Sequence, residues 1–126
     1  MRTLPFWFIG LATLFALAGM AFGIFMSASQ DHTLASAHAH NNLIGWVTMA
    51  LYGFYYKAVP VAAKSRLALV HFWITLAGAL TFGIGIAMAI TGKGEALAMI
   101  SSFLVTLAML IFAYTVWANK SALTVD

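Results

Sequence analysis

Two histidines near the start of a long apolar segment are the residues of this sequence best suited to chemistry. One residue separates His38 from His40. On a helix, positions two residues apart differ in direction by about 200°, so the two rings would point to opposite sides and could not easily bind one metal together. Neutral imidazole suits heme iron, copper or zinc. The spacing therefore predicts one ligand for each of two sites that flank the helix.

The other groups that could take part in chemistry stand apart from this pair. His71 lies near the start of another apolar segment, where a structural hydrogen bond to backbone or headgroup and a step in a proton path are the two interpretations. His32 lies in a polar stretch, where a surface histidine is the ordinary interpretation and copper binding the other. Met20 and Met26 are typical packing residues that can also be thioether ligands.

The composition decides which kind of protein must position these side chains. Of the 126 residues, 63% are hydrophobic and only 7% are charged, whereas a soluble domain has about 25% charged residues. So few charges cannot cover a soluble surface, and lipid is the natural solvent. There are no cysteines, which excludes disulfides and thiolate metal sites. The net charge of +3 comes from scattered residues, so a nucleic-acid partner is not expected.

Four apolar runs are long enough to span a membrane, which needs roughly 20 such residues. They predict an all-α fold, a single domain over residues 1–126 that forms an integral membrane bundle of four transmembrane helices, at about 5–27, 35–59, 67–90 and 97–118. The first run could be mistaken for a signal peptide, but it is about twice as long as a usual signal core.

Positive charges predict the orientation of these helices. Five of the six basic residues fall on one side of the predicted membrane, namely Arg2, Lys57, Lys64, Arg66 and Lys120, and only Lys93 falls on the other. By the positive-inside rule, both termini are then cytoplasmic. The protein is expected in a bacterial inner membrane, as a multi-pass protein with the histidine pair near the outer face.

The polar surroundings of the histidine pair leave a second interpretation open. Both rings could lie at the membrane surface, hydrogen-bonded to water or lipid headgroups. Asn41 and Asn42 follow directly and lead into a fully apolar run, which favours a functional pair instead. Deeper in the same run, Trp46 could pack on a porphyrin or in the core, whereas Tyr55 and Tyr56 are expected in an interfacial belt.

Several motifs resemble one family when taken in order. Ser36-Ala37-His38-Ala39-His40, followed by Leu43-Ile44-Gly45-Trp46-Val47, resembles a late helix of the catalytic subunit of heme-copper oxidases, and is closest to the C-type branch. The likeness continues through Tyr55-Tyr56-Lys57-Ala58-Val59-Pro60, Leu69-Val70-His71-Phe72-Trp73 and Ile100-Ser101-Ser102. Nearly the whole chain resembles the last four of the family's twelve core helices, which form one of its three arcs.

The resemblance implies specific roles for single residues. His38 would bind the iron of a high-spin heme, and His40 the iron of a low-spin heme. Lys93 matches the basic residues that bind heme propionates, although Glu95 could pair with it instead. Heme b is the implied cofactor, and copper is the other metal that the family holds. His32 could contact a propionate.

This chain also departs from the family. It has neither an H-P-E-V-Y-type segment to hold copper nor the helix that supplies a second axial histidine. Three copies would restore twelve helices, so a homotrimer is expected, with each heme held by His38 of one chain and His40 of its neighbour. Such a protein would be an oxidoreductase that transfers electrons, with a redox partner, or that acts on O2 or NO, and catalytic residues are not assigned.

Two other functions fit the sequence. The first is a copper or heme binding or sensing module without turnover, and His32, His38 and the methionines would hold copper in it. The second is an accessory subunit without a cofactor, whose histidines lie at the membrane surface. Metal analysis and the visible spectrum distinguish them: copper with no Soret band favours the binding module, and a colourless purified protein favours the accessory subunit.

Overall fold

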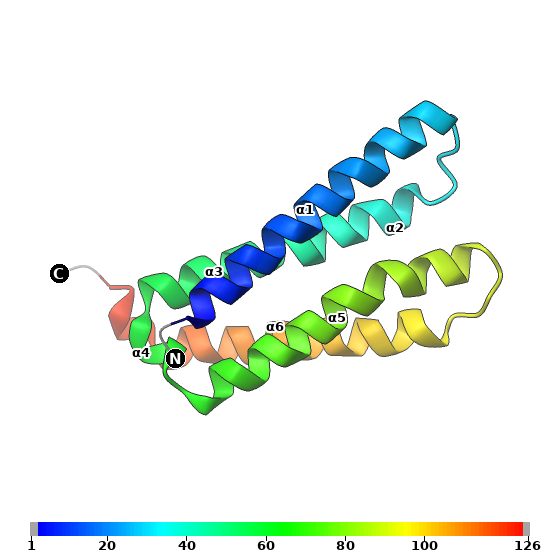
Figure 1. Ribbon diagram of the computed structural model, residues 1–126. Coiled ribbons are helices and arrows are strands. Elements are labelled where there is room, and N and C mark those ends of the chain that lie inside the picture. The colour runs from blue at the N-terminus through cyan, green and yellow to red at the C-terminus, as the bar shows by residue number, and fades with distance from the viewer. Residues whose placement is uncertain (1–2, 125–126) are drawn as a thin grey trace.

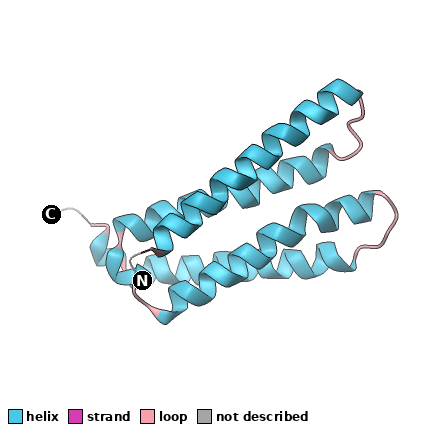
Figure 2. Ribbon diagram, in the orientation of Figure 1, coloured by secondary structure: helices cyan, strands magenta, loops and turns pink. Residues whose placement is uncertain are grey.

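The computed structural model describes residues 3–124, and within this range the chain is helical apart from short turns (Figure 2). No strand occurs between these residues. Arg2, one of the charges used to predict the orientation, lies outside the described residues. The all-α class predicted from composition is confirmed for the part of the chain that is described.

Three helices are long and apolar enough to cross a membrane: α1 (Leu4–Ser29), α5 (Arg66–Ile90) and α6 (Ala96–Ala118). They contain 26, 25 and 23 residues, and a bilayer core needs roughly 20. Their ends lie within two residues of the predicted runs 5–27, 67–90 and 97–118. The protein therefore has the helices of a membrane protein.

Local sequence explains where these helices begin and end. Ser65 precedes α5, and its side-chain oxygen accepts a hydrogen bond from the Ala68 amide at 3.1 Å, which satisfies a free donor of the first turn. Pro5 lies in the first turn of α1, where no amide donor is needed. Gly92 and Gly94 have φ angles of 75° and 108° in the turn that joins α5 to α6.

The second predicted run is helical but not uniform. It contains α2 (Ala35–His40), the π-helical segment η1 (Asn41–Thr48) and α3 (Met49–Ala58), which follow one another without a break. No single α-helix in this run reaches the length of a membrane span, so the described residues contain three such helices rather than the predicted four. At Val59 the backbone leaves the helical region, with φ −121° and ψ 76°, because Pro60, the first residue of α4 (Pro60–Ala63), disfavours a helical residue before it.

The helices form two hairpins. α1 packs along α3 and η1, α5 packs along α6, and α2 contacts α5 and so joins the hairpins. Figure 1 shows the turns at 30–34 and 91–95 at one end of the molecule, which we call the loop end. The opposite end, which we call the terminal end, contains α4, the start of α1 and the end of α6. The hairpins lie close together at the terminal end and separate towards the loop end.

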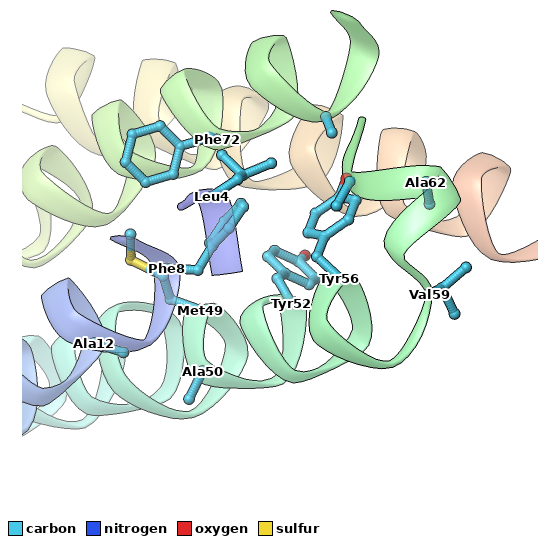
Figure 3. Packing of buried hydrophobic residues seen from close by; sticks show 12 residues of the cluster. Leu4, Phe8, Ala12, Met49, Ala50, Tyr52, Tyr56, Val59, Ala62 and Phe72 are labelled. Carbon is cyan, nitrogen blue, oxygen red and sulfur yellow. The ribbon is translucent and has the colours of Figure 1, made fainter. Parts of the chain in front are cut away.

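The apolar core lies mainly in the terminal half of the bundle (Figure 3). It consists of Leu4, Phe8, Ala12, Met49, Ala50, Tyr52, Tyr56, Val59, Ala62, Ala63, Ala68 and Phe72. Towards the loop end, α5 and α6 are held together by close backbone packing. A Cβ atom on Gly85 would lie 2.6 Å from the backbone nitrogen of Ala98, so only glycine fits there.

Most of the surface of the long helices is not covered by the chain itself. Only 22% of the most apolar window of α1 and of α5, and 11% of that of α6, is buried. The uncovered side chains are mainly large and apolar, for example Phe25, Leu110 and Trp117. This surface suits contact with membrane lipid.

Candidate functional site

The histidine pair lies on α2, at the loop end of the molecule (Figure 1). The ring of His38 lies 5.8 Å from the ring of Phe22 on α1, measured between centroids. The ring of His40 lies 5.2 Å from that of Phe82 on α5, in a T-shaped arrangement. The two imidazoles therefore face different helices, which agrees with the directions that their spacing implies.

The turn before α2 is fixed by Asp31. The Asp31 carboxylate accepts hydrogen bonds from the amide and the hydroxyl of Thr33, at 3.0 and 2.6 Å. These two bonds hold the pKa of Asp31 below its usual 3.8, and the bond from the Thr33 hydroxyl has the larger effect. The turn therefore leads into α2 with an ionised carboxylate at neutral pH, close to the histidine pair in the chain.

His40 has the geometry of a ready metal ligand. Its Nδ1 lies 2.7 Å from the carbonyl oxygen of Ser36. Because a carbonyl can only accept, Nδ1 carries the ring proton, and the lone pair of the neutral ring is on Nε2. Within residues 3–124 no hydrogen bond engages Nε2, and the side chain is half-buried. A backbone carbonyl on one nitrogen and a free lone pair on the other is the usual arrangement of a metal-binding histidine.

His38 has a different environment. The Asn42 side-chain nitrogen lies 3.3 Å from Nε2 of His38, and because this amide nitrogen can only donate, Nε2 accepts the bond. Nδ1 of His38 and Oδ1 of Asn42 are buried and have no partner among the described residues. The nitrogen that would bind a metal is therefore occupied by a neighbouring side chain.

Two glycines of α1 make room for this pair. A Cβ atom on Gly19 would overlap Oδ1 of Asn42, and one on Gly23 would lie 3.3 Å from Cε1 of His38. The two glycines are four residues apart, a spacing that lets helices approach closely in membranes. His38 thus lies against α1 of its own chain rather than on an outer surface.

A cavity of about 280 Å³ lies between α1, α2 and α5, next to the histidines. Its walls include Phe22 of α1, Ala37 and Asn41 of α2, and Gly83 of α5, and neither histidine lines it. Asn41 is the one residue with a polar side chain in this lining, and its amide donates to the Phe15 carbonyl at 3.4 Å. The cavity therefore suits an apolar occupant.

The other residues predicted to bind the cofactor lie further out. Trp46 belongs to η1 and is 37% exposed, so it does not pack in the core of one chain. Lys93 is exposed in the 91–95 turn, at the same end of the bundle as the histidines (Figure 1). Hydrogen bonds and ring contacts within residues 3–124 link neither residue to the pair.

His71 lies in the core, where four tyrosine and phenylalanine side chains surround it. It is 0% exposed, and its Nδ1 lies 2.9 Å from the hydroxyl of Tyr56. The rings of Phe8, Tyr52 and Phe112 lie 5.6, 4.5 and 6.0 Å from its own. Its Nε2 is buried and has no partner in the described chain.

This arrangement corrects one prediction and refines another. Tyr56 was expected in an interfacial belt, but it is 1% exposed and belongs to the core, because the hairpins converge at the terminal end. His71 makes a structural hydrogen bond in the core, and the Tyr56 hydroxyl is its partner. The spacing of Tyr52 and Tyr56, four residues apart on one helix face, was the signal that could have indicated burial.

The residues predicted for copper do not form a cluster in the described chain. His32 and Met20 are exposed, and Met26 is buried in α1. Between residues 3 and 124 there is no group of three or more histidine, cysteine, aspartate or glutamate side chains that could hold a metal. A metal in this protein would therefore take its ligands from fewer residues of one chain, or from several chains.

Comparison with family models, curated proteins and solved structures finds no match to this chain. The relation to heme-copper oxidases therefore stays a prediction from the motifs. At the site itself, Nε2 is free in the imidazole of His40 and hydrogen-bonded in that of His38.

Proposed function

We propose that this chain is a heme b-binding membrane protein in which His40 supplies an axial ligand to the iron. The observation that carries the proposal is the 2.7 Å contact between Nδ1 of His40 and the Ser36 carbonyl. It fixes the tautomer of the ring and leaves Nε2 free to bind a metal. The contact with Phe82 holds the ring in one orientation.

The second axial ligand would come from another copy of the chain. In the same copy, Nε2 of His38 is hydrogen-bonded to Asn42, and among residues 3–124 the ring found beside His40 is that of Phe82, not a histidine. The proposal is a homotrimer, because three four-helix chains would match one oxidase subunit of twelve helices. The largely uncovered surface of α6 provides area for contact between copies.

The membrane topology of the proposal has four spans. The helical path Ala35–Ala58 is longer than the roughly 20 residues that a span requires, although η1 interrupts its α-helical part. Lys57, Lys64, Arg66 and Lys120 lie at the terminal end and would face the cytoplasm. The histidine pair would then lie near the outer face of a bacterial inner membrane.

Each residue near the iron would have a defined task. His40 would bind it, and Lys93, at the same end of the bundle, would pair with a propionate. Trp46 would lie against a porphyrin held between copies, since it is exposed in a single copy. When bound, heme with two histidines supplies electron transfer, and heme with one supplies O2 or NO binding.

A second candidate function is a scaffold or accessory subunit without a cofactor. The hydrogen bonds of His38 to Asn42 and of His71 to Tyr56 favour it, because both use histidine as a structural group. In this function the purified protein would be colourless.

The visible spectrum of the purified protein, oxidised and dithionite-reduced, separates the two candidates. The proposal predicts a Soret band and sharp reduced bands of a b-type cytochrome, with heme and three copies of the chain in one complex by native mass spectrometry. A colourless protein that retains its helicity would contradict the proposal, and copper without a Soret band would favour the copper-binding module.

A further inference from the structure

The two histidines of α2 differ in one respect that concerns metal binding. Each has its ring lone pair on Nε2, but only that of His38 is hydrogen-bonded. We propose that Asn42 is a positioning residue that masks His38, so that His40 is the permanent ligand and His38 binds a metal only after its bond to the Asn42 amide is broken. The consequence for heme binding rests on the proposed function. The hydrogen bond that masks His38 is present in the chain without a metal.

The direction of the hydrogen bond follows from the atoms involved. The contact of 3.3 Å joins Nδ2 of Asn42 to Nε2 of His38. An amide nitrogen has protons and no lone pair to offer, so Nε2 must accept. A metal would need the same lone pair, so the amide and the metal compete for one atom.

Helix packing keeps Asn42 in this position. The residues are four apart, so their side chains lie on the same face of the segment, and that face lies against α1. Oδ1 of Asn42 fits against Gly19, where any larger residue would overlap it. Close approach of α1 therefore leaves the amide little freedom to turn away from His38.

The mask is one that a metal can displace. Nδ1 of His38 and Oδ1 of Asn42 are buried without partners, so the pair is less stable than a fully hydrogen-bonded one. A neutral hydrogen bond with a net value in the usual range would weaken metal binding between about two- and twelvefold, rather than abolish it. The chain would thus hold iron through His40 and add or release His38 when the packing of α1 changes.

The test compares Asn42→Leu with the wild-type protein and with Asn41→Leu in detergent micelles. Leucine at position 42 keeps the approximate shape and removes the donor. Asn41→Leu changes the adjacent amide, which donates to the Phe15 carbonyl and does not touch His38. The probe is Zn²⁺, followed at the ring nitrogens of His38 by ¹⁵N NMR, with the His71 signals as a check that the core is folded.

The inference predicts that Asn42→Leu shifts the His38 Nε2 resonance towards that of an unbonded lone pair before any metal is added. It also predicts that the zinc Kd at His38 is about two- to twelvefold lower in Asn42→Leu than in wild type. Asn41→Leu should match wild type in both the Nε2 resonance and the zinc Kd. An unchanged resonance, or an unchanged Kd at His38, would overturn it. If Asn42→Leu lost the His71 signals, Asn42→Ala would be measured in its place, with the same expected result.

A hemin titration of the same three proteins separates this inference from the proposed function. If hemin binds none of them while the zinc Kd changes as expected, the proposed function fails and the masking stands. If hemin binds but neither zinc nor hemin distinguishes Asn42→Leu from wild type, the masking fails and the proposed function stands.

Discussion

Replacing Tyr56 with phenylalanine removes the hydrogen-bond partner of the buried His71. The hydroxyl lies 2.9 Å from Nδ1 of His71, and the two residues are 1% and 0% exposed. A buried polar group that loses its partner costs about 1–3 kcal/mol. Interhelical hydrogen bonds in membranes average about 0.6 kcal/mol and reach about 1.7. Because both groups are fully enclosed, we expect Tyr56→Phe to destabilise the protein by about 1–2 kcal/mol.

A double-mutant cycle isolates this interaction. His71→Phe leaves the Tyr56 hydroxyl unpaired, whereas the double variant removes both polar groups and so costs less than the two single changes added together. We expect a coupling free energy near 1 kcal/mol, measured by reversible unfolding in mixed micelles with increasing SDS. Tyr55→Phe is the matched control, because its hydroxyl donates to the Thr115 carbonyl at 3.2 Å from a half-buried side chain, and should cost less. Additivity within about 0.3 kcal/mol would refute the pairing.

Two further predictions concern the α5–α6 packing and the turn at the loop end. Gly85→Ala would place a Cβ atom 2.6 Å from the backbone of Ala98 and should cost about 1–3 kcal/mol in the same unfolding assay, whereas Gly10→Ala, with nothing nearer than 3.8 Å, should cost nothing. If Gly85→Ala and Gly10→Ala changed the stability equally, α5 and α6 would not be in close backbone contact at Gly85. Asp31 has a lowered pKa, so its hydrogen bonds to Thr33 stabilise the turn above pH 3.8 and this contribution is lost as the pH falls through the lowered value. Thr33→Ala should raise the pKa of Asp31, as followed by carboxyl-carbon NMR, and an unchanged midpoint would contradict the bonds.

Hydropathy was enough to place the long helices but not to describe the second one. The predicted helix 5–27 agrees closely with the observed Leu4–Ser29, because length and apolar content decide which segments can lie in lipid. The same criterion cannot distinguish α- from π-helical backbone, since both satisfy their own hydrogen bonds. The segment Asn41–Thr48 therefore looked like an ordinary helix in the sequence.

The side-chain contacts of the site were also only partly predictable from the sequence. The spacing of His38 and His40 was sufficient to predict that their rings diverge, because helix geometry alone sets direction. That Asn42 occupies the metal-binding nitrogen of His38 depends on the close approach of α1 at Gly19, which is a tertiary contact. The burial of Tyr56 was missed for a similar reason, since position near a helix end indicates an interface only where no other helix packs.

Whether His40 binds heme iron is decided by the heme content of His40→Ala, compared with that of His32→Ala. Both variants remove one imidazole at the loop end, but His32 is an exposed turn residue and His40 has the free Nε2. Heme per chain is measured after purification under identical conditions, together with the reduced spectrum. If His40 is the axial ligand, wild type and His32→Ala carry the same amount of heme b and His40→Ala loses it. Full heme in His40→Ala, with an unchanged spectrum, would show that His40 is not the ligand.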